Sequence, residues 1–479
     1  MTHSTTESAV GASPAPNVSH SITVRLEVPA GGTAVGHLTT TVEQSGGVVT
    51  ALDVAASRGD ALRIDLTIAA GDTHHADRIT DALRAIPDVE VKKVSDRTFL
   101  MHLGGVIETA SKHALRNRDD LSMVYTPGVA RICQAIAADR EDARRLTIKR
   151  NSVAVVTDGS AVLGLGNIGP HAALPVMEGK AALFKTFGGI DAWPLCLDTQ
   201  DVDQIVEIVA AVAPGFAGVN LEDISAPRCF EIEERLRQRL DIPVFHDDQH
   251  GTAIVVLAAL RNALRVVEKS LEDVRVVLVG AGAAGTAILR LLLGAGLSDV
   301  VVCDVDGIVS TERGDTDPTL CWIGENTNPR GVTGTLKDAL RDADVFIGVS
   351  APRLIDAADV ETMADDAVVF ALANPDPEID PSLARQHARV VATGRSDYPN
   401  QINNVLAFPG IFRGLLDAHS HGIEVPVLLA ASEAIAACVE DDELNADYIV
   451  PSVFHPEVHH RVADAVEKAA RAVEKAHEA

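Results

Sequence analysis

The stretch Val274-Arg-Val-Val-Leu-Val-Gly280-Ala-Gly282-Ala-Ala-Gly285 places an apolar run directly before a Gly-x-Gly-x-x-Gly pattern. The run predicts a buried strand, residues 283–293 predict an apolar helix, and residues 300–303 predict a second strand that ends at Asp304. A strand, a glycine-rich turn, a helix and a strand followed by an acid form the βαβ unit of dinucleotide-binding sheets. The sequence therefore predicts a Rossmann-type domain whose helix N-terminus faces a pyrophosphate.

This unit also indicates which residues contact a cofactor. We expect binding through Asp304 and through the turn and helix start, which comprise Gly280, Gly282, Ala283, Ala284 and Gly285. A carboxylate accepts a hydrogen bond from a free ribose 2′-hydroxyl and repels a 2′-phosphate, so Asp304 favours NAD, while the nearby Arg313 keeps NADP possible. Asn374 follows the predicted strand 368–370 and is expected at the same sheet edge, with an ordinary Asx turn as the alternative.

Two further motif matches do not fit their usual contexts. A second Gly-x-Gly-x-x-Gly pattern, Gly164 to Gly169, is followed at once by Pro170, and we expect no suitable helix to begin there. His246 and His250 have the spacing of zinc-hydrolase ligands. A strand is predicted before the first of them, and Asp stands where those enzymes have Glu, so we do not expect zinc.

Length, charge and hydropathy restrict the class of protein. A chain of 479 residues is too long for one hydrophobic core and predicts about three domains. The net charge of −27 argues against nucleic acid as a partner. No apolar run approaches the roughly 18 residues of a membrane span, and no signal-peptide pattern opens the chain. We therefore expect a cytoplasmic protein with no membrane partner.

The alternation of predicted strands and helices divides the chain. Residues 1–19 lack hydrophobic patterning and predict a disordered leader. Residues 20–95 follow the βαββαβ order of a ferredoxin-like module. Strands alternate with helices over 110–250, which predicts an α/β domain with a parallel sheet, and again over 251–395, the Rossmann-type domain. Residues 396–479 predict a helical segment whose apolar stripe packs on a core or a second subunit and comprises Val458, Val462, Val466 and Val473.

Acidic residues follow two strands of the first predicted parallel sheet. Glu222 and Asp223 come after one strand, and Asp248 comes after the next along the chain. If these strands are neighbours, the three carboxylates converge at one edge, and oxygen ligands of this kind suit Mg²⁺ or Mn²⁺. The alternative for Asp247 and Asp248 is a favourable position at a helix N-terminus, which we expect of Asp247.

Two residues upstream are candidates for proton transfer. Lys180 is expected in the first turn of a helix over 179–187. Near a dication and partly desolvated, it would have the lowered pKa of a general base. Tyr125 precedes Pro127-Gly128, which predicts a type II turn that would present the phenol as a proton donor. A lysine extended along the surface and a packed tyrosine are the structural alternatives.

Six segments occur in order along the chain: Tyr125-Thr-Pro-Gly-Val-Ala, Thr157-Asp-Gly-Ser-Ala-Val-Leu-Gly-Leu-Gly-Asn, Met177-Glu-Gly-Lys-Ala, Asn220-Leu-Glu-Asp-Ile, Phe245-His-Asp-Asp-Gln-His-Gly-Thr-Ala and Asn403-Asn-Val-Leu-Ala-Phe-Pro-Gly. In this order they resemble the short bacterial malic enzymes, over about residues 110–435. The resemblance implies oxidative decarboxylation of (S)-malate to pyruvate and CO₂ with a nicotinamide cofactor and Mn²⁺ or Mg²⁺.

The resemblance also implies individual roles. Lys180 would take the 2-hydroxyl proton, Tyr125 would protonate the enol, and Asn404 is a candidate for binding the substrate. The metal would be held by Glu222, Asp223 and Asp248. The larger malic enzymes carry an Arg just after the Asp-Gly of the Thr157 segment, whereas this chain has Ser160-Ala161. The resemblance therefore does not identify the group that binds the far carboxylate of malate, and the candidates are Asn404, the backbone N–H groups around Gly164–Gly166, and another Lys or Arg.

The remaining expectations concern regulation and assembly. Residues 20–95 resemble an ACT domain, a module that either senses a small-molecule effector or pairs subunits, and both alternatives stay open. We expect a homodimer or a higher homo-oligomer. Two alternative functions are a malolactic enzyme, which retains NAD and releases lactate, and a catalytically silent sensor.

Overall fold

The computed structural model describes residues 16–30, 33–58, 60–162 and 164–478. The chain divides into two compact units, Met1–Glu108 and Thr109–Ala479. Within the part of the chain that the structure describes, no helix is long and apolar enough to cross a bilayer.

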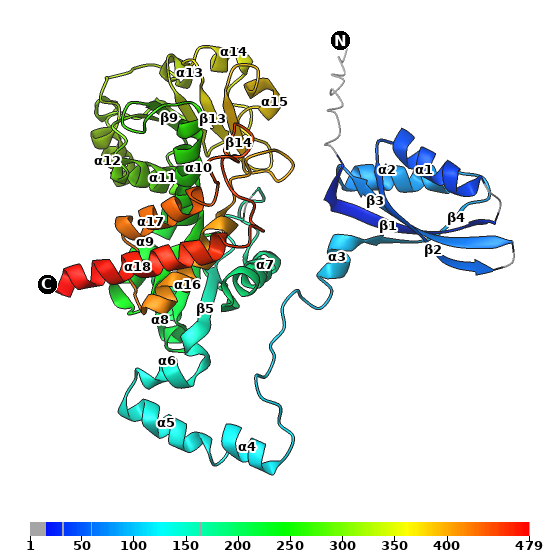
Figure 1. Ribbon diagram of the computed structural model, residues 1–479, viewed down its shortest axis with the longest axis horizontal. Coiled ribbons are helices and arrows are strands. Elements are labelled where there is room, and N and C mark those ends of the chain that lie inside the picture. Colours follow the sequence, from blue (N-terminus) through cyan, green and yellow to red (C-terminus); the bar gives the residue numbers. More distant parts are fainter. Residues whose placement is uncertain (1–15, 31–32, 59, 163, 479) are drawn as a thin grey trace, which may run out of the picture. The chain divides into compact units, whose positions relative to one another are not determined.

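The first unit is a four-stranded antiparallel sheet with two helices on one face (Figure 1). Its strand order is β2-β3-β1-β4. Val24, Leu26, Ile64 and Leu66 are buried against the helices, which explains the alternating apolar pattern. The elements follow the expected βαββαβ order: β1 (Asn17–Pro29), α1 (Ala34–Gln44), β2 (Val48–Arg58), β3 (Ala61–Ala70), α2 (Thr73–Arg84) and β4 (Glu90–Asp96).

The predicted leader is too long at its C-terminal end. Strand β1 begins at Asn17, which pairs with Ala70 of β3, and after an irregularity the ladder with β3 continues from Ser21, so residues 17–19 belong to the strand. Residues 1–15, which make up most of the predicted leader, lie outside the described residues. After the sheet come α3 (Arg97–Met101) and a connection with no helix or strand up to Asn117.

The second unit opens with short helices that precede its sheets: α4 (Arg118–Val124), α5 (Val129–Ala138) and α6 (Asp142–Leu146). No residue of α4 or α5 is buried. The predicted type II turn at Tyr125 is wrong, because Gly128 has φ −58° and caps α5 in a right-handed conformation, whereas that turn needs a positive φ.

The first sheet of this unit is parallel, with the order β6-β5-β7-β8. Its strands are β5 (Ser152–Thr157), β6 (Asp191–Cys196), β7 (Gly218–Leu221) and β8 (Val244–His246), and its helices are α7 (Pro170–Gly188), α8 (Val202–Val212) and α9 (Arg228–Arg239). A helix does begin directly after Gly169, contrary to expectation. Pro170 is its first residue, a position where the missing N–H of proline has no partner to lose.

The second sheet is the Rossmann-type sheet predicted from Gly280, with the order β11-β10-β9-β12-β13-β14. Five strands are parallel: β9 (Arg275–Val279), β10 (Asp299–Asp304), β12 (Val345–Gly348), β13 (Val368–Ala371) and β14 (Val390–Thr393); β11 (Gly307–Ile308) pairs antiparallel with β10. In sheets of this kind, the carboxyl ends of the parallel strands form the ligand-binding edge. The helices around it are α10 (Thr252–Val266), α11 (Ala283–Gly294), α12 (Pro318–Asn326), α13 (Leu336–Leu340), α14 (Ala357–Glu361) and α15 (Pro381–Ala384).

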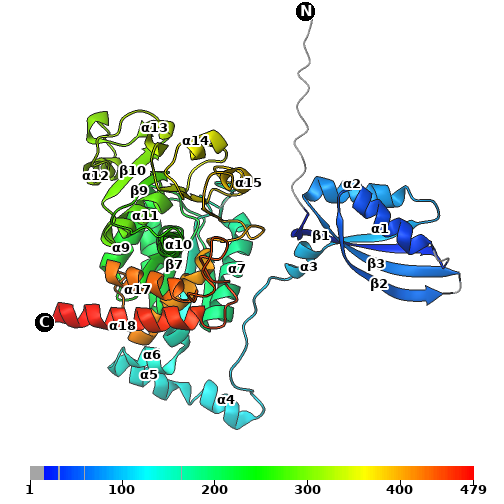
Figure 2. The ribbon, with the colours of Figure 1, turned by 45° about the horizontal axis from the view of Figure 1, so that its top comes forward.

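Three C-terminal helices complete the unit: α16 (Phe408–Ala418), α17 (Val425–Ala436) and α18 (Val458–Glu478). Helices α17 and α18 lie side by side in both views (Figure 1 and Figure 2), and α16 also packs against α18. The expected stripe of α18 packs on them, with Val458, Val462 and Val466 fully buried. Helix α16 presents glycines at this crossing. A Cβ at Gly414 would lie 2.5 Å from the carbonyl oxygen of Ala463, so the close approach requires glycine.

Candidate functional site

Lys180 lies in the middle of α7, not in a first turn, and its side chain is only 10% exposed. Its Nζ donates a hydrogen bond to Asp247 Oδ2 at 2.7 Å and lies 2.9 Å from Glu222 Oε1. The ammonium also stands over the ring of Phe408, 4.2 Å from the centroid. The alternative of a lysine extended along the surface is therefore wrong.

In the absence of a metal ion, the surroundings of this lysine raise its pKa, the opposite of the shift expected beside a dication. Burial lowers the pKa of Lys180, but the charges of Asp247 and Glu222 and the hydrogen bond to Asp247 raise it more, so the net shift is upward. The sequence predicted a lowered pKa for a lysine beside a dication, and it did not show that two acids contact Nζ. Without a metal charge nearby, the ammonium form is the stable one.

The three predicted acids come together at the carboxyl edge of the first sheet. Strands β7 and β8 are neighbours, with Leu221 opposite His246, and one ligand atom from each of the three acids lies within 4.8 Å of the others. Asp223 has φ 54°, a left-handed conformation that breaks the strand alternation and lets two consecutive carboxylates join one cluster. Its N–H donates to Asp248 Oδ2 at 3.0 Å.

This cluster fits a divalent cation. Glu222 and Asp223 are buried, and burial followed by the charge of Asp248 raises the pKa of Glu222, although Lys180 opposes the shift. Three carboxylates and the neighbouring Asp247 face one ammonium, so the site lacks positive charge. Hard oxygen donors of this kind match Mg²⁺ or Mn²⁺ rather than zinc.

Asp247 does more than favour a helix terminus. It belongs to a π-helical turn, Asp247–Gly251, and its Oδ2 accepts hydrogen bonds from Lys180 and from Asn404 Nδ2, the latter at 3.2 Å. Thr252 Oγ1 donates to Asn404 Oδ1 at 3.2 Å, which fixes the amide orientation. Asn404, a predicted substrate ligand, thus lies beside the lysine. Asp247 was not assigned this role from sequence.

The two histidines of this segment, His246 and His250, lie in different surroundings. His250 Nε2 lies 2.8 Å from Glu233 Oε1 on α9, whereas His246 is fully buried. Burial raises the pKa of Glu233, but His250 lowers it more, to about 2. Among the described residues, the cluster able to hold a metal contains neither imidazole. Through its contact with His250, Glu233 on α9 fixes the π-helical turn, a role that the sequence did not reveal.

The predicted cofactor turn lines a cavity of about 340 Å³. Its walls include Gly280, Gly282, Asp304 and Ser350 from the Rossmann-type sheet and Phe230 from α9. The glycines are required by close contacts, since a Cβ at Gly285 would lie 1.7 Å from the carbonyl oxygen of Gly280. Helix α11 has no side-chain cap, so the first N–H groups, at Ala283 and Ala284, can face an anionic ligand.

Asp304, the predicted ribose ligand, is paired with Arg313. Nη1 and Nη2 of Arg313 donate to Oδ1 and Oδ2 of Asp304 at 2.7 and 2.6 Å, and Asp315 binds the same guanidinium. The hydrogen bonds from Arg313 hold the pKa of Asp304 below its usual value. The sequence placed Arg313 nearby but not in a bidentate pair.

Two predicted residues are not brought to these groups. Tyr125 is 68% exposed, on a segment whose helices have no buried residue, and among the described residues it makes no hydrogen bond to Lys180 or the acids. Asn374 Nδ2 donates to its own loop, at Leu372 O, 3.4 Å away. Its place after β13 is as predicted, but this contact is not the Asx turn given as the alternative, because the amide nitrogen donates to a preceding carbonyl.

The Asp158–Ser160 loop, which lacks the arginine of the larger malic enzymes, contacts an arginine from another part of the chain. Arg228, the first residue of α9, donates from Nη1 to the buried Asp158 Oδ2 at 2.9 Å and from Nη2 to Ser225 Oγ at 2.9 Å. Ser160 Oγ accepts the N–H of Ser225 at 2.9 Å. A guanidinium is therefore present beside the Asp158–Ser160 loop, supplied from 70 residues further along the chain.

A dinucleotide-binding sheet beside a buried lysine and three clustered acids defines the class of protein, a nicotinamide-dependent oxidoreductase. Family models for the N-terminal domain of malic enzyme and for its NAD-binding domain match residues 104–237 and 249–471. The chain belongs to the malic enzyme family.

Individual relatives agree with this assignment. An NAD-dependent malic enzyme of Geobacillus stearothermophilus is 56% identical over 449 residues, which cover 94% of each chain and therefore most of the first unit as well. A bifunctional malic/malolactic enzyme of Bacillus subtilis is 55% identical over 76% of this chain and 90% of its own. The crystal structure of an NAD-dependent malic enzyme from Thermotoga maritima, 48% identical, superposes with a TM-score of 0.75 over 78% of this chain and 99% of that one.

Proposed function

We propose that this chain oxidatively decarboxylates (S)-malate to pyruvate and CO₂ and reduces NAD⁺ in a reaction that requires Mn²⁺ or Mg²⁺. The single observation that carries the proposal is the contact of Lys180 with Asp247 and Glu222 beside the three-acid cluster. The cytoplasmic location and the division at residues 110–250, 251–395 and 396–479 are part of the same proposal.

Lys180 is the proposed base. It takes the proton of the 2-hydroxyl of malate, while Asp247 and Asn404 fix the position of its Nζ. Glu222, Asp223 and Asp248 would hold a dication, which would supply Lewis-acid stabilisation of charge on the substrate oxygen. The charge of that dication would also offset the acids that raise the pKa of Lys180, which would favour the neutral amine. Gly280–Gly285 and Asp304 would hold the dinucleotide, which would supply the hydride acceptor.

Tyr125 is the proposed proton donor to the enol, and its exposure supports a homodimer. The segment around it exposes Leu121, Met123 and Val124 as well as the phenol. Apolar side chains in such number are usual at an interface, so we propose that a second copy covers them and receives Tyr125.

Mixing the Lys180→Ala variant with the Tyr125→Phe variant tests this arrangement. If each site takes Lys180 from one copy and Tyr125 from the other, random exchange of subunits should restore about a quarter of the activity. No recovery after proven exchange would place both residues in one chain's site.

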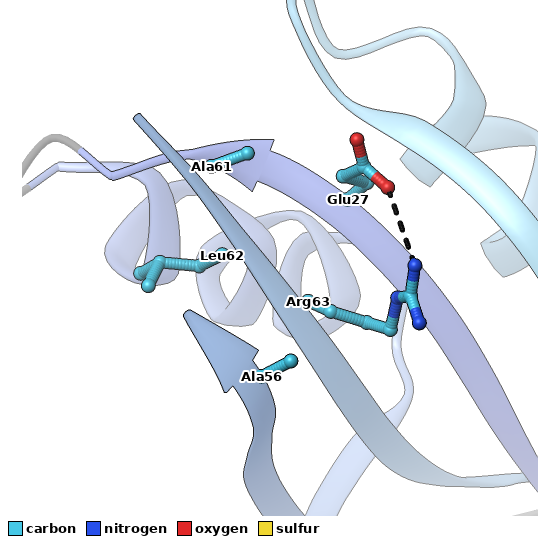
Figure 3. A pocket seen from close by; sticks show the side chains of 5 residues that line it. All are labelled: Glu27, Ala56, Ala61, Leu62 and Arg63. Atoms are coloured by element: carbon cyan, nitrogen blue, oxygen red, sulfur yellow. Dashed lines mark ion pairs between the residues drawn. The ribbon is translucent and has the colours of Figure 1, made fainter. Parts of the chain in front are cut away.

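The first unit is proposed to be an ACT-like module that binds an effector or pairs subunits. A shallow hollow on its sheet is lined by Ala56, Ala61 and Leu62 and by Glu27 and Arg63, which pair with each other at 3.8 Å (Figure 3). Because these charges already compensate one another, the hollow itself offers little to a charged effector. Removing residues 1–108 should leave the chemistry intact and change assembly or effector response. If the truncated protein has the same assembly and the same effector response as the full-length chain, the first unit neither pairs subunits nor binds an effector.

The activity test uses malate with NAD⁺ or NADP⁺, with and without a chelator. Reduced cofactor should form with NAD⁺ and a dication, and no reduction with either cofactor would refute the proposal. A malolactic reaction is the second candidate, favoured by the likeness to the bifunctional Bacillus subtilis enzyme. It would yield lactate without net NADH, so product analysis separates the two. Malate turnover of either kind excludes a silent sensor.

A further inference from the structure

Glu378 is a fully buried acid in the cofactor domain that the sequence did not mark. It follows β13 on the loop that also contains Asn374, and its side chain is completely inaccessible to solvent. Burial raises its pKa. Burying a carboxyl group costs free energy, so its contacts must compensate for that cost.

Those contacts join two loops. Glu378 Oε1 accepts the N–H of Ser350 at 2.9 Å, and Oε2 accepts the N–H of Ala373 at 3.0 Å. Ser350 follows β12, whereas Ala373 follows the neighbouring strand β13. One side chain therefore fixes the carboxyl ends of two adjacent strands at the ligand-binding edge of the sheet.

The first of these loops lies at the cofactor cavity. Ser350 lines it together with Gly280 and Gly282. A Cβ at Gly280 would lie 2.6 Å from the carbonyl oxygen of Val349, so the glycine-rich turn packs directly on the loop after β12. Gly348 makes room for the acid, since a Cβ there would lie 2.5 Å from Glu378 Cδ. A movement of the Ser350 loop is therefore transmitted to the turn that binds the dinucleotide.

We propose that Glu378 is a positioning residue for the nicotinamide cofactor. It holds the Ser350 and Ala373 loops at a fixed separation, so that the cavity wall and the glycine-rich turn are formed before the dinucleotide binds. Pre-formed walls raise affinity because the ordering cost is met on folding rather than on binding. The inference rests on NAD as the cofactor of the proposed reaction.

The test compares Glu378→Gln with Asp359→Asn in the full-length chain. Glutamine keeps the shape but has one acceptor oxygen, so one of the two N–H groups loses its partner. The Kd for NADH and the KM for NAD⁺ should rise about tenfold, the order of one lost buried hydrogen bond, while the KM for malate stays within about twofold. Asp359 is also buried and acidic but caps α14 through the N–H of Asp356. Its variant should lower Tm without changing NADH affinity.

Hydrogen exchange of the unaltered protein supplies a second, independent measurement. The amides of Ser350 and Ala373 should exchange slowly, because both are bonded to a buried acid. Rapid exchange at either amide, or normal NADH affinity in folded Glu378→Gln, would overturn the proposal. If Glu378→Gln does not fold, the exchange rates decide. NADH binding is measured without malate, so a failure of the proposed malate reaction is distinguishable from a failure of this inference.

Discussion

Replacing Arg313 with alanine should strengthen the preference for NAD over NADP. The guanidinium now neutralises Asp304, the acid beside the dinucleotide cavity, through two hydrogen bonds. Without Arg313, Asp304 loses the contacts that lower its pKa, yet an ordinary Asp with a pKa of about 3.9 is still ionised at neutral pH. Its full negative charge then faces the ribose and repels a 2′-phosphate.

The size of the effect follows from the charges and their exposure. The charge that the substitution removes is that of the Arg313 guanidinium. Two unit charges about 4 Å apart interact by about 1 kcal/mol in water and about 4 kcal/mol at an effective dielectric constant of 20. The side chains of Arg313 and Asp304 are 19% and 14% exposed, so we take an intermediate value of about 2 kcal/mol. That free energy corresponds to a change of about 30-fold in the ratio of kcat/KM values for NAD and NADP.

The assay measures kcat/KM for both cofactors at saturating malate and dication, or the Kd of NADH and NADPH where turnover with NADP is too slow. Arg330→Ala is the matched control, because Arg330 pairs with Asp299 at 2.8 Å at the opposite end of the same strand. The control should leave the ratio unchanged. An unchanged ratio in Arg313→Ala, or a shift toward NADP, would refute the reasoning.

Three further predictions concern chemistry and packing. Lys180→Ala should lower malate oxidation by at least about 10²-fold and leave NADH binding intact; normal turnover would remove Lys180 as the base. Chelation should abolish activity, and added Mn²⁺ should restore it in the unaltered protein but far less in Glu222→Gln; equal recovery would show that Glu222 holds no metal. Gly414→Ala should cost about 1–3 kcal/mol of unfolding free energy because its Cβ meets the Ala463 carbonyl, as measured by denaturant titration. Gly215→Ala, with nothing within 4 Å of its added Cβ, is the control, and equal losses would contradict the packing argument.

The sequence predicted the features that follow from periodicity and from strand polarity. The Rossmann-type sheet was predictable because an apolar run, glycines and an acid occur in one local order. The three acids could be grouped because the carboxyl ends of parallel strands meet at one edge, and β7 and β8 are indeed neighbours. Both arguments need only local patterns and one assumption about strand adjacency.

The remaining features depend on contacts between distant residues. Lys180 and Asp247 are 67 residues apart, so neither the hydrogen bond nor its effect on the pKa is visible in a local pattern. Glu378 resembled an ordinary loop acid because its two partners are backbone N–H groups, which leave no trace in side-chain composition. The errors at Pro170 and Gly128 have another cause: the fixed φ of proline suits both a loop and the first turn of a helix, glycine permits several backbone conformations, and the neighbouring elements decide between them.

The π-helical turn Asp247–Gly251 makes the length of its segment a constraint in its own right. A π-helical turn holds about one residue more than an α-helical turn, so deleting one of its residues would change the bonding pattern that places Asp247 and Asp248, and deleting one residue within α10 would rotate the rest of that helix by about 100°. Helix α10 is buried on nearly all sides, with eleven of its residues inaccessible, and cannot accommodate such a rotation. Insertions and deletions should therefore be excluded between Asp247 and Val266 even where single substitutions are tolerated, and loop-length variation among relatives should fall elsewhere.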